Sequence, residues 1–275
     1  MTYKELEHKA REARKLIVET LITAGVGHGG GSLSSADVMT ALYFDVMKLD
    51  PANPRWDGRD RFVLSKGHCS VGLYAHLCLR GLISKEDLLS FRQNGSLLSG
   101  HPDMLKVPYV EMSTGSLGHG LSVGVGMALA GRMDKKDYRV FVLVGDGESQ
   151  EGSIWEAAMS AGHYKLDNLT VIIDRNNIQI DGFTEKIMTL EPYADKWRAF
   201  GWEVREINGH SMAEIVPTLK SVPFSSGKPS LVIAHTTKGK GVTFMENNHL
   251  WHGGAPKGDL AAQARREVDD ALAKD

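Results

Sequence analysis

The sequence predicts an α/β protein in which a parallel β-sheet is flanked by helices on both faces. Four short apolar segments, at residues 139–144, 168–174, 202–207 and 230–234, alternate with segments long enough to form helices. Apolar strands separated by helices are typical of parallel sheets that are covered on each side. Because no repeat, low-complexity tract or linker interrupts the pattern, we expect a single domain over residues 1–275.

The helices are expected from the spacing of apolar residues and from the glycines. Residues 3–24 carry apolar side chains three or four positions apart, and a glycine-rich tract at residues 25–31 should end that helix. Further helices are expected at residues 36–47, 71–80, 84–93, 120–132, 152–165, 191–200 and 211–221. The charged stretch at residues 260–275 indicates a solvated amphipathic helix.

Composition excludes several classes of protein. A formal net charge of -2 over 275 residues supplies no basic field, so we expect no nucleic acid and no acidic membrane surface as partner. The two cysteines, Cys69 and Cys78, form no CxxC pattern and no disulfide framework, which indicates a reducing compartment. With no signal peptide, and no apolar run near the roughly 20 residues of a membrane span, the sequence predicts a cytoplasmic protein.

The strongest chemical signal is a pair of polar turns that each follow an apolar strand. The tripeptide Gly-Asp-Gly at residues 145–147 is followed, after 28 residues, by Asn-Asn at residues 176–177. If the two strands are parallel and residues 152–165 form the crossover helix, both turns lie at the same carboxyl edge of the sheet. That edge is where open α/β sheets bind their ligands.

The residue types at this edge suit a metal and a diphosphate. The Asp146 carboxylate and the Asn176 amide oxygen are hard ligands of the kind that Mg²⁺ shares with substrate phosphates. Gly147 has no side chain, so a phosphate can approach its N–H at the start of the following helix. Taken singly, both turns could be ordinary turn residues. Their spacing and context favour the metal and diphosphate site.

Several motifs, in order, resemble the N-terminal, pyrophosphate-binding domain of transketolase. The resemblance covers nearly the whole chain and includes the thiamin diphosphate motif formed by the two polar turns. The other motifs are GHGG at 27–30, DRFVLSKGH at 60–68, GHP at 100–102, STGSLG at 113–118 and WHGGAP at 251–256. The resemblance implies the thiamin-diphosphate-binding (pyrophosphate domain) fold.

The resemblance also implies roles for individual residues. By position, Asp146, Asn176 and the backbone carbonyl of Ile178 bind the metal, which is Mg²⁺ or, in its place, Ca²⁺ or Mn²⁺. Gly147 contacts the diphosphate of thiamin diphosphate. The remaining cofactor-binding residues that it implies are Gly115, Ser116, Leu117, His68, Asn176, Lys238 and His252.

Four of the eleven histidines interrupt loops rich in glycine, serine or proline: His28, His68, His101 and His252. Imidazole can hold a hydroxyl or move a proton near neutral pH, so these residues are candidates for catalysis. The alternatives are loop histidines with backbone partners, or zinc ligands, but none shows the paired spacing of a zinc site. The resemblance makes His28, His101 and His252 catalytic.

The resemblance adds one acidic residue and shows two departures. Glu151 would belong to an acidic network through the subunit interface. The chain has His119 where the family commonly has glutamine, and Gly29 where it frequently has proline. These departures affect how a substrate fits and leave the cofactor assignment unchanged.

Two weaker patterns carry no functional assignment. Residues 25–30 satisfy GxGxxG, but they follow a helix rather than a strand, so they do not predict a dinucleotide site. The KGKG stretch at residues 238–241 lacks the preceding glycine spacing of a P-loop.

The resemblance implies transfer of a two-carbon ketol unit from a ketose, usually a sugar phosphate, to an aldose. The alternatives are a subunit of a 2-oxoacid dehydrogenase, a deoxyxylulose phosphate synthase, or a silent module of the same fold. In the family a pyrimidine-binding domain completes the site, and the resemblance ends shortly after residues 251–256. We therefore expect a second transketolase subunit with the pyrimidine-binding and C-terminal domains, in an α₂β₂ heterotetramer. The start at Met1 and the charged terminus favour a naturally split enzyme over a shortened chain.

Overall fold

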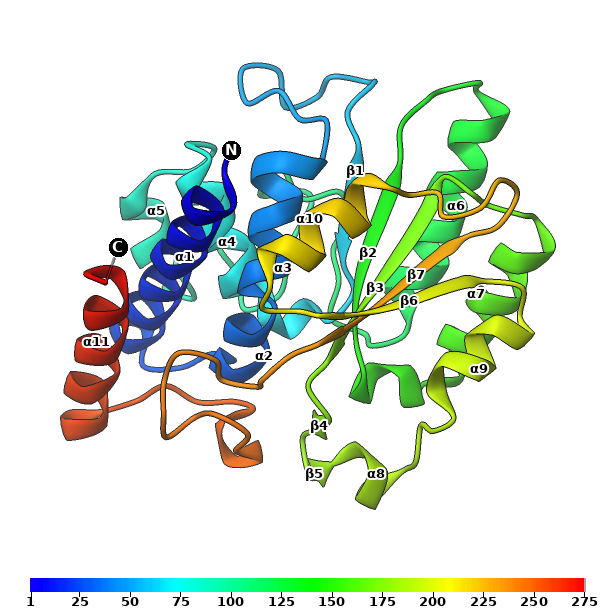
Figure 1. The fold of residues 1–275 in the computed structure, drawn as a ribbon. Helices are drawn as coiled ribbons and strands as arrows, with labels where there is room; N and C mark the ends of the chain where they lie inside the picture. Colours follow the sequence, from blue (N-terminus) through cyan, green and yellow to red (C-terminus); the bar gives the residue numbers. More distant parts are fainter. Residues whose placement is uncertain (275) are drawn as a thin grey trace.

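A five-stranded parallel sheet forms the centre of the protein (Figure 1). The structure is a computed structural model and describes residues 1–274. The sheet order is β1-β2-β3-β7-β6, and each pair of neighbours runs parallel. Its strands are β1 (Arg61–Leu64), β2 (Val140–Gly145), β3 (Leu169–Arg175), β6 (Glu203–Asn208) and β7 (Ser230–His235). The predicted α/β class and parallel sheet are confirmed.

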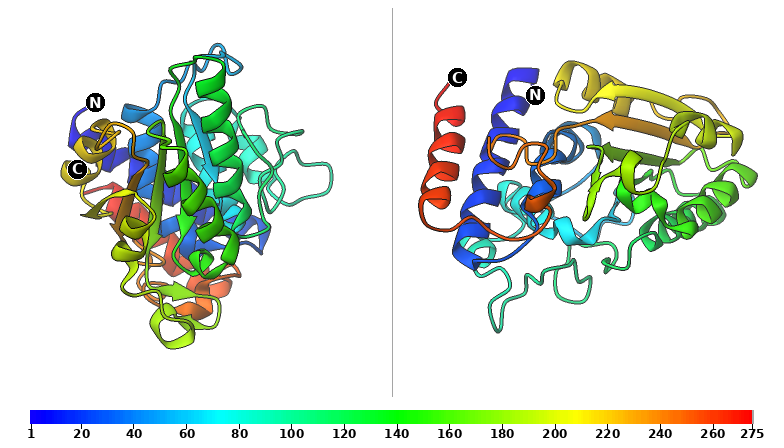
Figure 2. Two further views of the ribbon diagram at one scale, coloured as in Figure 1. Left: turned by 90° about the vertical axis from the view of Figure 1, so that its right-hand side faces the viewer. Right: turned by 90° about the horizontal axis from the view of Figure 1, so that it is seen from below.

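Helices cover both faces of this sheet, as Figures 1 and 2 show. One layer packs with α1 and the other with α6. The first layer contains α1 (Tyr3–Ala24), α2 (Gly29–Ser34), α3 (Ala36–Ala41), α4 (Ser70–Leu79), α5 (Lys85–Leu89), α10 (Met212–Lys220) and α11 (Gly258–Leu272). The second contains α6 (His119–Met133), α7 (Gly152–His163) and α9 (Tyr193–Ala199).

The strands divide their side chains between two apolar cores. On β2, Phe141 and Leu143 pack with α1, α3 and α4, whereas Val142 and Val144 pack with α6 and α7. This alternation follows from the period of two along a strand. Because both faces are buried, the strands are apolar at nearly every position, which is the pattern that made them recognisable in the sequence.

Short elements at the carboxyl edge of the sheet complete the fold. After β3 the chain forms a small antiparallel hairpin and a short helix, which lie beside the ends of β2 and β3 (Figure 1). These elements are β4 (Ile178–Gln179), β5 (Gly182–Phe183) and α8 (Thr184–Ile187). Single helical turns occur at Leu42–Val46, Gly67–Cys69, Gly147–Gln150 and His249–Trp251.

Three features differ from the sequence-based expectation. The strand β1 lies inside the motif at residues 60–68, and its four residues are too few to show a period. The glycine tract does end the first helix, but α2 begins again at Gly29 and stays buried, so three of these glycines are helical. The helix expected at residues 84–93 stops at Leu89. Across residues 1–274, no helix is long and apolar enough to cross a membrane.

Candidate active site

The two polar turns lie side by side at the carboxyl edge of the sheet. Strands β2 and β3 are paired in parallel, with Gly145 opposite Asp174, and α7 is the crossover between them. The expected edge is therefore formed. A hollow of about 260 Å³ opens there, and nine of the predicted site residues line it: His68, Leu117, Asp146, Gly147, Glu151, Asn176, Ile178, Lys238 and His252.

The remaining predicted residues lie next to this hollow. The His28 ring contacts those of His68 and His252, with centroids 5.2 and 5.7 Å apart. His101 lies beside Gly115, because a Cβ built on this glycine would be 2.9 Å from the His101 ring. Gly115 and Ser116 line a neighbouring hollow together with His119.

Asp146 presents a buried carboxylate at the end of β2. Its Oδ1 accepts a hydrogen bond from the Gly147 N–H at 2.8 Å, and its Oδ2 accepts one from the Asn177 N–H at 2.5 Å. Burial, reinforced by the negative charge of Asp174 nearby, raises the pKa of Asp146 to about 6. The Arg175 guanidinium lies 3.4 Å from the carboxylate and offsets this effect only in part. A divalent cation at this position would relieve the burial of the charge.

The oxygens next to Asp146 suit magnesium better than a softer metal. The Asn176 amide donates to Asp174 at 2.9 Å, and the amide orientation leaves its oxygen toward the Ile178 N–H at 3.2 Å. The carbonyl of Ile178 accepts a hydrogen bond from the Lys238 ammonium at 3.2 Å. Residues 1–274 contain no group of three His, Cys, Asp or Glu that could hold a metal. A metal here therefore depends on amide, carbonyl and phosphate oxygens, which is the ligand set that Mg²⁺ accepts.

Lys238 supplies the observation that fits a diphosphate. Its ammonium is buried and contacts only a carbonyl and, at 3.1 Å, His252 Nδ1; within residues 1–274 it forms no ion pair. Burial lowers its pKa. A buried cation without a counter-charge is costly, so the site calls for an anionic ligand. Lys66, by contrast, is paired within the protein.

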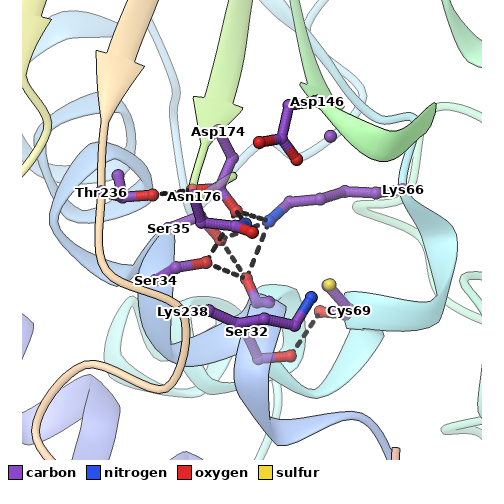
Figure 3. A network of polar contacts seen from close by, with 12 residues as sticks. Ser32, Ser34, Ser35, Lys66, Cys69, Asp146, Asp174, Asn176, Thr236 and Lys238 are labelled. Carbon is purple, nitrogen blue, oxygen red and sulfur yellow. Dashed lines mark hydrogen bonds and ion pairs between the residues drawn. The ribbon is translucent and has the colours of Figure 1, made fainter. Parts of the chain in front are cut away.

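The pair of Lys66 and Asp174 forms a polar floor beneath the site (Figure 3). The two charges are 2.6 Å apart and fully buried. Although burial alone would raise the pKa of Asp174, the Lys66 ammonium holds it below its ordinary value. Asp174 also accepts hydrogen bonds from Ser34 at 2.7 Å and Thr236 at 2.5 Å. This floor fixes the end of β3, where the next residues are Arg175 and Asn176.

Glu148 ties three loops of the site together. Its buried carboxylate accepts hydrogen bonds from the Ser65 hydroxyl at 2.5 Å and from the N–H groups of Gly118 and Gly145, each at 3.0 Å. Burial raises its pKa. Sequence reasoning did not assign Glu148, Lys66, Asp174 or Arg175 to the site. The available signal was a charged residue directly adjoining each polar turn or motif histidine, where a parallel sheet is buried.

The histidines around the hollow are held neutral. Burial, reinforced by neighbouring positive charges, lowers the pKa of His28 and of His68 to about 4 and that of His252 to about 2. Burial also lowers the pKa of His101. The His28 Nδ1 atom is buried and has no hydrogen-bond partner within the described residues. Neutral imidazoles with free ring nitrogens suit a ligand rich in hydroxyl groups.

Comparison with known proteins identifies the family. The model of the transketolase, thiamine diphosphate binding domain matches residues 6–270. The chain belongs to this family. It therefore carries the thiamine diphosphate binding domain of a transketolase.

Two curated relatives are matched over nearly their whole length. One of the two subunits of an apulose-4-phosphate transketolase from Phocaeicola vulgatus is 52% identical over 100% of this chain and 97% of its own. A 6-deoxy-6-sulfo-D-fructose transketolase subunit, SqwG, from Clostridium sp. is 49% identical over 90% of each chain.

Other members of the family are longer. Human transketolase is 38% identical over 96% of this chain, but that match covers 42% of its own length. The crystal structure of Campylobacter jejuni transketolase superposes with a TM-score of 0.92 at 37% identity, covering 98% of this chain and 43% of that one. The chain thus spans less than half of these transketolases.

Proposed function

We propose that this chain is the thiamin-diphosphate-binding subunit of a two-chain transketolase, which transfers a two-carbon ketol unit from a ketose or its phosphate to an aldose. The observation that carries the proposal is the buried, unpaired Lys238 beside the oxygens of Asp146, Asn176 and Ile178. These groups suit a diphosphate and a divalent cation at one sheet edge. The relatives that match over their whole length are themselves named as transketolase subunits.

The roles of the cofactor residues follow from where they lie. Asp146, Asn176 and the Ile178 carbonyl would hold Mg²⁺, or Ca²⁺ or Mn²⁺ in its place, together with the diphosphate. The Lys238 ammonium and the N–H of Gly147 would neutralise and orient the diphosphate. His68 would support it from the side of the paired Lys66. Gly115, Ser116 and Leu117 would form the opposite wall.

The chain's own histidines would act on the sugar. When bound, thiamin diphosphate supplies the electron sink for breaking the carbon–carbon bond of the ketose. His28, His101 and His252 would hold hydroxyl groups of the sugar and move protons at them. Because burial keeps these rings neutral at pH 7, each can accept at one nitrogen and donate at the other.

A second chain would complete the site. In this proposal the hollow formed by one domain holds the diphosphate end, and a pyrimidine-binding domain of the partner covers the other end. Glu151 is exposed at the rim, where an acidic network could pass between chains. We further propose an α₂β₂ assembly in the cytoplasm, with residues 1–275 as one domain. The sharing of one sheet by two apolar cores supports the single domain.

Two alternatives give distinct outcomes. A 2-oxoacid dehydrogenase subunit or a deoxyxylulose phosphate synthase would decarboxylate a 2-oxoacid, and a silent module would do neither reaction. The loops that contain His68 and His101 favour ketol transfer. The metal-binding and diphosphate-binding groups are intact, which disfavours a silent module.

The test is an activity assay with the partner polypeptide present. The purified chain is mixed with the partner, thiamin diphosphate and Mg²⁺, and is supplied with a ketose phosphate and an aldose, or separately with pyruvate. We expect ketol transfer in the mixture, none from either chain alone, and no decarboxylation beyond background. Decarboxylation without ketol transfer would overturn the proposal.

A further inference from the structure

A buried polar network, remote from the hollow, reaches the Lys238 loop from behind. It joins Arg14 of α1, Asp37 of α3 and His210, which lies in the turn between β6 and α10. Arg14 and Asp37 are 8% and 6% exposed, so the network is sealed within the helical layer. None of these residues lines the cofactor hollow or faces the proposed substrate.

The geometry fixes the tautomer of His210. The Thr237 N–H lies 2.8 Å from His210 Nε2, and a backbone N–H can only donate, so this nitrogen must be an unprotonated acceptor. His210 Nδ1 lies 2.7 Å from Asp37 Oδ2 and must then carry the proton that it donates. Asp37 orients the ring, and the ring holds the backbone of Thr237.

Asp37 is suited to this task because it stays ionised. Burial alone would raise its pKa, but the charge of Arg14 and the hydrogen bond from His210 lower it to about 2. Arg14 makes two contacts with the Asp37 carboxylate and also donates to the Leu33 carbonyl at 3.3 Å. The carboxylate is therefore anchored on one side and free to accept from His210 on the other.

The backbone that His210 holds leads directly into the cofactor site. Thr237 precedes Lys238, whose ammonium touches the Ile178 carbonyl and His252. The neighbouring Thr236 bonds to Asp174 in the polar floor. The loop is thus fixed on two sides, by the floor in front and by the His210 network behind.

We propose that Asp37 and His210 are positioning residues that hold Thr237 and thereby aim the Lys238 ammonium at the bound diphosphate. This inference rests on the proposed function, since it needs a diphosphate at Lys238. It adds residues that neither the motifs nor the lining of the hollow include. The chemistry is a neutral imidazole that reads a backbone N–H and is oriented by a carboxylate.

The test compares two substitutions at His210 with one at a matched position. In His210→Phe the ring shape stays but both hydrogen bonds are lost, whereas a glutamine side chain can accept from Thr237 and donate to Asp37. His235→Phe is the control, because His235 is exposed at the end of β7 and pairs with the exposed Glu206. Each variant is assembled with the partner chain and titrated with thiamin diphosphate at fixed Mg²⁺.

We expect His210→Phe to weaken cofactor affinity roughly tenfold, about the worth of one buried hydrogen bond, while the midpoint of thermal unfolding measured without cofactor stays close to wild type. His210→Gln should recover most of the affinity, and His235→Phe should match wild type. Unchanged affinity in His210→Phe, or an equal loss in the Phe and Gln variants, would overturn the inference.

A measurement on the wild-type protein keeps the inference testable if His210→Phe does not fold. Nitrogen NMR of labelled histidine should show His210 with a protonated Nδ1 and an unprotonated Nε2 at pH 7. The opposite tautomer would overturn the network. If the wild-type complex itself does not bind thiamin diphosphate, the proposed function fails, whereas normal binding by wild type and His210→Phe alike refutes only the positioning role.

Discussion

At the scale of single residues, the site combines charges that the protein pairs with charges that it leaves for a ligand. Lys66 has Asp174 as its partner, and both are buried. Lys238 is equally buried but has no acidic partner within residues 1–274. Since an unpaired buried charge is costly, the contrast indicates which ammonium belongs to the fold and which belongs to the ligand.

Asp146 is the residue whose removal should separate binding from folding. We expect Asp146→Ala to abolish the Mg²⁺ dependence of thiamin diphosphate affinity, because the carboxylate is proposed to hold the metal. The fold should remain largely intact, since Arg175 keeps its contacts with Glu185 and Glu191 at 3.1 and 3.0 Å. The measurement is a calorimetric titration with and without Mg²⁺.

The matched control for this substitution is Asp181→Ala, at an exposed position in the turn of the β4–β5 hairpin. It removes the same side chain close to the site and should leave the affinity unchanged. A metal dependence that survives Asp146→Ala would contradict the assignment of this residue as a ligand.

The channel histidines should affect turnover more than cofactor binding. Replacing His28 or His101 with alanine in the assembled enzyme should lower turnover on a ketose by about 10²- to 10⁴-fold, the usual loss for a positioned acid or base. The affinity for thiamin diphosphate should change far less. The control is His163→Ala at the end of α7, away from the hollow. Turnover within a few-fold of wild type would mean that these rings only support their loops.

At the scale of elements, the sequence predicts best where a period is long enough to read. The strands β2, β3 and β7 appear within one or two residues of the expected positions, because apolar runs bounded by polar turns mark them. The hairpin with α8 was not expected, since two-residue strands carry no period. Their place is set instead by tertiary contacts, among them the ion pairs of Arg175 with Glu185 and Glu191.

The site was predictable for a related reason. Asp146 and Asn176 each end a long apolar strand, so the parallel topology alone brings them to one edge. Glu148 and His210 could not be assigned in this way. Their partners lie on segments far away in the sequence, and only the packing of helices and loops shows that Asp37 faces His210.

The tie between α1 and α3 should be visible in acid. Asp37→Asn removes the charge that pairs with buried Arg14, and breaking such a pair typically costs about 3–5 kcal/mol of unfolding free energy. The pKa of Asp37 falls from an ordinary 3.8 to about 2 on folding. The stabilisation from its charge is thus fully present above pH 4 and is lost as the pH falls through 2. By linkage this part amounts to about 2 kcal/mol.

The expected result is a stability gap between wild type and Asp37→Asn that is constant at higher pH and narrows from pH 4 to pH 2. Denaturant unfolding at several pH values measures it. The control is Asp269→Asn on α11, because this exposed carboxylate pairs with Lys15 of the same helix α1 at 2.6 Å. An exposed pair is worth at most about 1 kcal/mol. Equal effects of the two substitutions would contradict the assigned burial.

At the scale of the whole molecule, one face of the protein is unusually apolar for a surface. Helices α6 and α7 lie on the side of the sheet opposite α1 and α11 (Figures 1 and 2). Met133 of α6 and Met159 of α7 are 81% and 57% exposed. Along α6, the exposed positions before Met133 include three small residues: Ser122, Gly126 and Ala130.

The glycines of α6 have two different uses. Gly120 and Gly124 face inward, where an added Cβ would lie 2.4 Å from Ser65 Oγ and 2.5 Å from a Val142 methyl, so they allow close packing within this chain. Gly126 faces outward with open space around it. The helix spacing suggested by the sequence therefore serves burial at some positions and leaves others for a second chain.

The assembly prediction follows from this face. If two copies of this chain meet at α6 and α7 across a two-fold axis, Ala130→Glu places a charge and extra volume into a close contact between helices. In a mixture with the partner chain, light scattering should give the mass of an α₂β₂ tetramer for wild type and that of an αβ pair for Ala130→Glu. The matched control is Leu260→Glu on α11, at the opposite side of the molecule. A tetramer that persists in Ala130→Glu, or one lost equally in Leu260→Glu, would show that the copies do not meet at this face.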